Sequence, residues 1–246
     1  MANLFFRPDE LLSEIEALRQ LCAGFLAPDS FQLQELAGDI RGLKEQKSGR
    51  LTLEIPEDRP LMTKPSEGQF ERAPRSSGRS VVAKVTGKWD VKIVKTKVPD
   101  QSRPNKKARE LLLLDFVDRA STVIHVVDEG GTDPIACWKM ELGISSSPGC
   151  FFHTFASGDA NFPVPRHPNL FPTPMSAIGF VLGELFQDEW EQEVSKAGFD
   201  PPQRWRSIQS RRLLALFAWQ MELAKAATAS PWYAIKAGKP LPSIFL

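Results

Sequence analysis

The sequence predicts an α+β fold, in which helices from both ends of the chain pack on one face of an antiparallel sheet of about four to six strands. Two observations lead to this class. The middle of the chain contains short apolar runs, several of which alternate with polar residues as strands do. Both ends contain apolar residues at intervals of three and four, as amphipathic helices do. We expect a single domain over residues 1–246, with a flexible loop at 56–79 that is rich in Pro, Ser, Gly and charge.

The N-terminal segment predicts a helical hairpin. Residues 8–27 carry a clear apolar stripe, and Pro8 suits the first position of a helix. A second helix is expected over about 30–46. Because the link at Ala27 and Pro28 is short, the two helices should be antiparallel neighbours.

Two further helices are expected in the C-terminal part. The first begins at Thr173 and Pro174, which supply a cap and a first-turn proline, and it ends before Gly198. The second begins at Asp200. Its apolar residues lie close to helical spacing and are expected to pack in the core; they are Trp205, Ile208, Leu213, Leu216, Phe217 and Met221.

The middle of the chain predicts the sheet. We expect residues 80–97 to form a β-hairpin with a three-residue turn at Thr86, Gly87 and Lys88, because that register makes one face wholly apolar. A tight turn near Arg119 should separate the next two strands. The remaining expected strands are 51–55, 110–117, 121–127 and 135–142.

The register of these strands sets His125 opposite Cys137 and gathers polar side chains on one face, namely Asp115, His125, Cys137, Lys139 and Glu141. Two carboxylates can hold Mg²⁺ and a lysine can orient water, so Asp115, Glu141 and Lys139 are candidate catalytic residues of a nuclease-like, metal-dependent hydrolase. The order Lys139-Met140-Glu141 is the reverse of the Glu-x-Lys order in such nucleases. The alternative is a solvated face with a Lys–Glu pair.

A second candidate is a zinc site in the proline-rich segment 144–173. Cys150 and His153 have the Cys-x-x-His spacing of a ligand pair, and His167 follows in the same segment. Structural zinc sites usually show two close pairs, and this segment has one. The alternative is a buried thiol with hydrogen-bonded histidines. Mg²⁺ and Zn²⁺ are therefore the two cofactors that the sequence suggests.

Charge is distributed unevenly along the chain. The net charge is +1, yet residues 72–109 hold 12 basic and two acidic side chains. Such an excess can contact the phosphates of nucleic acid or an acidic protein, or it can simply be solvated. The candidate contact residues are Arg79, Lys84, Lys92, Lys95, Lys97, Arg103, Lys106 and Lys107.

Four short segments resemble a group of uncharacterised bacterial proteins. They are SPGC-x-FH at 147–153, FPVPRHP at 162–168, TPM at 173–175 and LGELFQDEW at 182–190. The resemblance implies a bacterial, cytoplasmic protein and no particular reaction. Three scattered cysteines also fit a reducing cytoplasm, and no run of about 18 apolar residues predicts a membrane span.

No phosphate loop, dinucleotide fingerprint or serine-hydrolase elbow is present in the sequence. We therefore expect a non-catalytic interaction module whose basic segment, 72–109, contacts nucleic acid or an acidic protein. One alternative is the metal-dependent hydrolase. Another is a subunit of a larger bacterial assembly, or an oligomer, that docks through its terminal helices.

Overall fold

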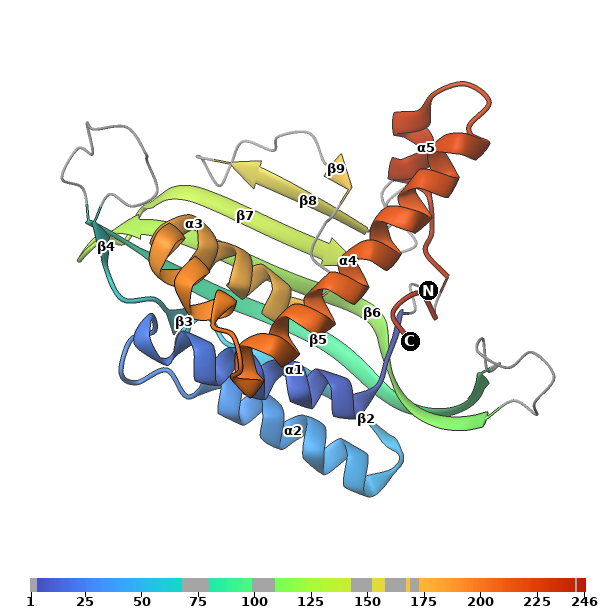
Figure 1. Cartoon of the computed structure of the whole chain (residues 1–246), viewed down its shortest axis with the longest axis horizontal. Helices are drawn as coiled ribbons and strands as arrows, with labels where there is room; N and C mark the ends of the chain where they lie inside the picture. Colours follow the sequence, from blue (N-terminus) through green and yellow to red (C-terminus); the bar gives the residue numbers. More distant parts are fainter. Residues whose placement is uncertain are drawn as a thin grey trace.

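The computed structural model describes residues 4–67, 80–98, 109–142, 152–157, 167–168, 173–241 and 243–246. It confirms the predicted α+β class, because helices from both ends of the chain cover one face of a curled antiparallel sheet (Figure 1). In the described part of the chain, no helix is both long and apolar enough to cross a lipid bilayer.

Two long strands form the centre of the sheet, β5 (Ser80–Val98) and β6 (Arg109–Asp128). One side of β6 continues into β7 (Pro134–Leu142), β8 (Phe152–Ser157) and β9 (His167–Pro168). The other edge of β5 pairs along its length with three strands, namely β2 (Gly49–Ile55), β3 (Leu61–Met62) and β4 (Ser66–Glu67). The short strand β1 (Leu4–Phe6) pairs with β6 at Leu114–Phe116.

The predicted hairpin over 80–97 is wrong, because these residues form the single strand β5. Gly87 lies within the strand, opposite Ile55 of β2 and Thr122 of β6. The indole of Trp89 lies over it, and a Cβ atom at residue 87 would approach that ring to 2.2 Å. Glycine is therefore required here for the close approach of a side chain and not for a turn.

The predicted turn near Arg119 is also wrong, because β6 runs through it. Trp89 pairs with Ala120 and Val91 pairs with Phe116, so one residue of β5 faces three residues of β6. This β-bulge absorbs the extra residues and bends the strand, which takes the place of the expected turn. The expected pairs His125 with Cys137 and Val123 with Lys139, by contrast, are both present.

The predicted loop at 56–79 contains regular structure in its first part. β3 and β4 lie there, and Leu61 and Thr63 are buried. Backbone bonds to β5 order these residues despite the local excess of proline and charge, as in the bond from the Thr63 amide to the Ala83 carbonyl at 3.0 Å. Residues 68–79 lie outside the described residues.

The helices begin close to the predicted positions, although the first ends at Leu21 and not at residue 27, and the short helix near the C-terminus was not predicted. They are α1 (Pro8–Leu21), α2 (Gln32–Gln46), α3 (Pro174–Ser195), α4 (Asp200–Ala226) and α5 (Pro231–Ala237), with a short 3-10 turn at Cys22–Gly24. The hydroxyl of Thr173 caps α3 by accepting a hydrogen bond from the Ser176 amide at 3.2 Å. This is the cap that the sequence predicted.

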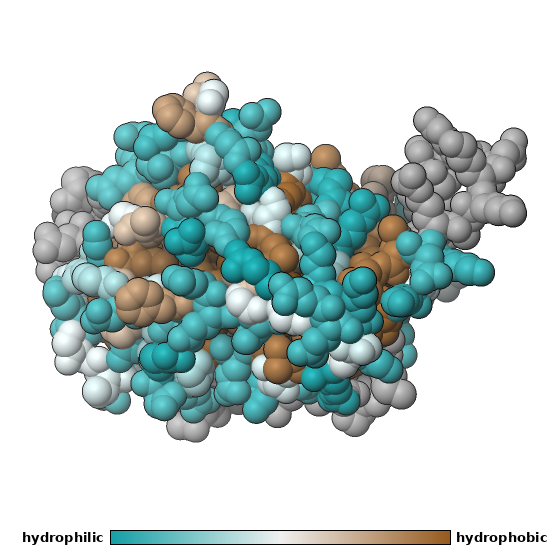
Figure 2. All heavy atoms as spheres, turned by 90° about the horizontal axis from the view of Figure 1, so that it is seen from below, coloured by the Kyte–Doolittle hydropathy of each residue, from teal (hydrophilic) through white to brown (hydrophobic). Residues whose placement is uncertain are grey.

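The core lies between the helices and the inner face of the sheet. Alternate residues of β5 are buried against apolar stripes of α1, α2 and α3 in one contiguous cluster. The face of the molecule that is seen from below is covered mainly by hydrophilic residues, with hydrophobic residues visible between them (Figure 2). The outer face of the sheet is the one that carries Lys84, His125 and Cys137, which are neighbours across β5, β6 and β7.

Candidate functional site

The polar cluster predicted on the outer face is only partly assembled. His125, Cys137, Lys139 and Glu141 share this face through the register of β6 and β7. Asp115 pairs instead with Lys92 and with Phe5 of β1, and it is buried. It lies six residues before Ser121, the partner of Glu141, which is roughly 20 Å along a strand. The prediction that placed Asp115 in the cluster is wrong because it depended on the absent turn.

Lys139 and Glu141 form an ion pair, with 2.5 Å between Nζ and Oε1. This is the alternative arrangement that the sequence allowed for these two residues. Among the described residues, no group of three or more His, Cys, Asp or Glu side chains is placed to hold a metal ion. The geometry of this part of the chain therefore does not supply the two-carboxylate magnesium site of the hydrolase hypothesis.

His125 and Cys137 lack the electrostatics of an activated nucleophile and base. Burial lowers the pKa of His125, and the ammonium of Lys84 acts in the same direction against the opposing charge of Glu57. Burial raises the pKa of the Cys137 thiol, an effect that Lys139 partly offsets. A reactive cysteine needs a depressed pKa, so this pair resembles ordinary neighbours in a sheet.

One of the three candidate zinc ligands lies outside the described residues, and the other two are described by their place in the sheet. Cys150 lies outside the described residues. The backbone register sets His153 opposite Glu141 and Pro168, and it sets His167 opposite Thr154. These positions are adjacent in β8 and β9, and the ligand hypothesis stays a prediction.

The basic segment is described only along β5. Lys92, Lys95 and Lys97 are exposed and Lys84 is half-buried, whereas Arg79, Arg103, Lys106 and Lys107 lie outside the described residues. Lys88, which was predicted to lie in a turn and not to contact a ligand, also lies on this strand and has its Nζ 3.8 Å from Glu54. Contact with nucleic acid stays a prediction for this segment.

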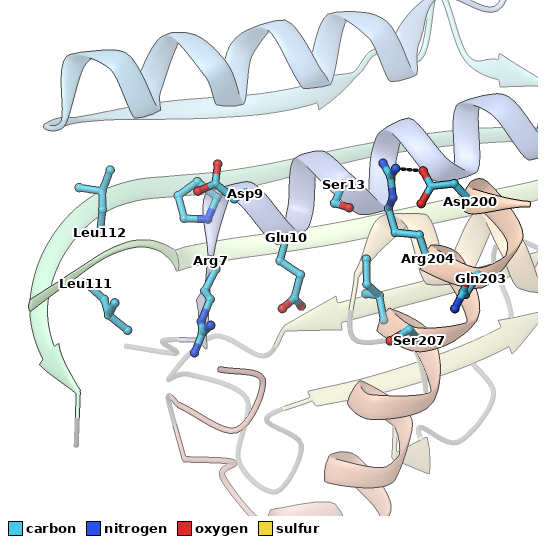
Figure 3. A pocket seen from close by; sticks show the side chains of 12 residues that line it. Arg7, Asp9, Glu10, Ser13, Leu111, Leu112, Asp200, Gln203, Arg204 and Ser207 are labelled. Atoms are coloured by element: carbon cyan, nitrogen blue, oxygen red, sulfur yellow. Dashed lines mark hydrogen bonds and ion pairs between the residues drawn. The ribbon is translucent and has the colours of Figure 1, made fainter. Parts of the chain in front are cut away.

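An open groove of about 890 Å³ lies between the starts of α1 and α4 and the start of β6 (Figure 3). Arg7, Glu10 and Arg204 line its walls, with Leu111 and Leu112 at one end. Most of its charges are already neutralised, since Arg204 pairs with Asp200 and Glu10 pairs with Arg211 and Arg212. The groove therefore does not favour one class of ligand.

A buried charge network fixes the first half of α4 to the rest of the molecule. Arg212 and Glu14 are fully buried, and Nη1 of the arginine donates to Oε2 of the glutamate at 2.6 Å. The other oxygen of Glu14 accepts from Gln209 Nε2 at 2.7 Å and from Thr173 Oγ1 at 2.8 Å. Glu10 accepts from Arg212 Nε at 3.0 Å. Helices α1, α3 and α4 are thus joined by hydrogen bonds to ionised groups.

The second half of α4 presents the opposite character, because four of its apolar side chains are exposed. We define the α4 stripe as Leu213, Leu214, Phe217 and Met221, whose exposed fractions are 37%, 68%, 46% and 51%. On α5, Trp232 and Tyr233 are 77% and 67% exposed. The sequence prediction that Leu213, Phe217 and Met221 pack in the core is therefore wrong.

The reason for this error is the position of Arg212. The residues of α4 that face the core include Trp205, Ile208, Arg212 and Leu216. The predicted core face was defined by apolar residues alone, and it therefore missed an arginine that lies at the same helical spacing. The acidic residues of α1 could have indicated that this arginine is buried, because a buried arginine needs acidic partners.

Comparison of the chain with protein-family models, with curated protein sequences and with solved structures finds no significant match. The function is therefore inferred from the residues of the chain itself.

Proposed function

We propose that the protein is a non-catalytic interaction subunit that docks on a protein partner through the α4 stripe, together with the exposed aromatic residues of α5. The observation that carries this proposal is the stripe itself. Leu213, Phe217 and Met221 follow one another at intervals of four residues, and Leu214 widens the row. Contiguous apolar patches on a protein surface mark interaction sites more often than single exposed apolar residues do.

The surroundings of the stripe suit a docking element. The first half of α4 is held by the network around Arg212, and α5 folds back on the second half (Figure 1). Gly238, which follows α5, packs closely against Leu223 and Trp219 of α4. These contacts cover a different side of the helix and leave the stripe exposed on a supported backbone. A preorganised apolar helix face of this kind binds with a small entropic cost.

A photo-crosslinking experiment tests the proposal. A photoreactive phenylalanine analogue at residue 217 should give a discrete protein adduct in cells that express the chain. The matched control is the same analogue at Phe31, which is 58% exposed at the N-cap of α2. Substituting Leu214→Ser with Met221→Ser should abolish the adduct at residue 217 and change the free energy of unfolding by less than about 0.5 kcal/mol each. The same adducts from residues 217 and 31 would refute the proposal.

The lysines of β5 support a second candidate, contact between the basic segment and nucleic acid. Lys92, Lys95 and Lys97 are exposed near one end of this strand. Binding to DNA that weakens steeply with salt, and that is lost when Lys92, Lys95, Lys106 and Lys107 are reversed to glutamate, would support it. Binding that survives this charge reversal would exclude it.

A further inference from the structure

We infer that the partner presents an acidic amphipathic helix to the α4 stripe. This inference rests on the proposed function and adds the chemistry of the partner. The stripe spans nine residues from Leu213 to Met221, or roughly 12 Å at the rise of an α-helix. A row of this length receives about two turns of a second helix, whose apolar residues repeat at intervals of three and four.

The C-terminal segment that carries the stripe is basic. Residues 200–246 contain seven Arg and Lys side chains and two Asp and Glu side chains. Both acids are occupied, because Asp200 pairs with Arg204 and Glu222 pairs with Lys225. Arg211 and Arg212 are neutralised by acids of α1.

Three cations of this region remain. Among the described residues, no acidic oxygen lies within 4.0 Å of Arg206, Lys236 or Lys239. Arg206 lies seven residues before Leu213, which is two helical turns, so it extends the line of the stripe. Arg206 and Lys239 are also exposed. A partner helix with Asp or Glu beside its apolar row would complement these charges.

A second copy of the chain fits this surface poorly. In a two-fold antiparallel pairing, Leu214 of one copy would face Phe217 of the other. The same symmetry then sets Arg206 opposite Lys225, whose charge is already paired with Glu222, so a second copy brings no unpaired carboxylate to Arg206. A lipid surface is also disfavoured, because the exposed side of the first half of α4 is polar, with Gln203, Ser207 and Ser210, whereas interfacial helices carry an apolar face along their length.

Binding of two designed helical peptides tests the inference. Both carry the same leucine row, one with glutamates and the other with lysines at the flanking positions. Fluorescence anisotropy should show that the acidic peptide binds the protein at least about tenfold more tightly than the basic peptide. Substituting Arg206→Glu with Lys239→Glu should reverse this preference. The matched control, Lys47→Glu with Lys64→Glu, makes the same change in net charge at exposed positions outside α4 and α5 and should leave the preference intact.

Several results would overturn the inference. Equal or absent binding of the two peptides would do so, as would a preference that survives Arg206→Glu with Lys239→Glu. A dimer in sedimentation that Phe217→Ser dissociates would identify a second copy as the occupant. Phe217-dependent binding to phosphatidylserine vesicles would identify a membrane. If the inference fails while the adduct at residue 217 still depends on Leu214 and Met221, docking stands with a different partner chemistry; if that dependence is absent, the proposed function fails.

Discussion

The two halves of α4 reverse the usual pattern of burial, because the first half buries a charged side chain and the second half exposes apolar ones. In the first half, the fully charged Arg212 is buried beside Trp205 and Ile208. In the second half, Leu214 and Met221 are exposed. Apolar character alone therefore does not determine which side of this helix faces the core. Two carboxylates of another helix neutralise Arg212 and so fix the rotation of α4 about its axis. As a result, the apolar stripe faces away from the core.

The strength of this constraint follows from the cost of burying charge. Rotating α4 by one residue, so that Leu213 replaced Arg212, would leave Glu14 buried without its cation. An unpaired buried charge costs several kcal/mol, whereas exposing a leucine costs about 2 kcal/mol. The guanidinium also lies 5.2 Å from the centre of the Phe6 ring, which adds a cation–π contact. The charge network should therefore dominate the orientation of the helix.

Among the substitutions in α4, that of Arg212 should have the largest effect on the free energy of unfolding. Arg212→Ala leaves Glu14 buried and unpaired, so we expect a loss of about 3–5 kcal/mol in the free energy of unfolding, measured by urea denaturation. The control Arg206→Ala, at an exposed position six residues earlier, should cost less than about 0.5 kcal/mol.

A double substitution separates the charge from the packing. Glu14→Leu with Arg212→Met removes both partners, and it should recover most of the stability lost in Arg212→Ala. If Arg212→Ala were as mild as Arg206→Ala, the network would not be what orients α4.

Two leucines of α4 provide the next comparison, since they lie two residues apart on opposite sides of the helix. Leu216 is fully buried and Leu214 is 68% exposed. We expect Leu216→Ala to cost about 2–5 kcal/mol because it leaves a cavity, and Leu214→Ala to cost less than about 0.5 kcal/mol. Denaturant midpoints at unchanged m-values would establish both changes. Equal costs at the two positions would mean that the stripe is covered within the protein.

Two glycines of α3 give a smaller effect at the contact with the first half of α4. A Cβ atom at Gly179 would lie 2.6 Å from the indole of Trp205, whereas one at Gly183 would meet its nearest neighbour at 3.4 Å. We expect Gly179→Ala to destabilise the protein by about 1–3 kcal/mol through overpacking. Gly183→Ala should be neutral or stabilise it by up to about 1 kcal/mol through helix propensity. Thermal unfolding of the two variants should therefore shift in different directions, and a loss at residue 183 as large as at 179 would contradict the close contact.

The sequence predicted those parts of the fold that depend on local signals. Pro8 and Thr173 with Pro174 mark helix starts through backbone chemistry that acts within a few residues, and these starts are correct. The pairing of His125 with Cys137 also followed, because a short turn and alternation set the register of neighbouring strands.

The errors concern residues whose environment comes from distant parts of the chain. Gly87 looked like a turn residue, but the indole of Trp89 and a strand on each side determine its role. Asp115 was placed by a turn that the bulge in β6 replaces. For the candidate docking surface, the apolar residues were identified, but their exposure depends on Arg212 and hence on Glu14, 198 residues earlier. No pattern within α4 contains that information.

The separation of 198 residues between Glu14 and Arg212 also affects when the protein can fold during its synthesis. At about 5–20 residues per second, roughly 10–40 s pass between the synthesis of Glu14 and that of Arg212. During that interval α1 has no cation for Glu14, and Phe6 has no guanidinium above its ring. Helix α1 is thus made before the other described helices but is among the last to reach its final neighbours. Folding should be completed only after synthesis has passed α4, and a nascent chain that stalls before it would retain an N-terminal helix open to chaperones.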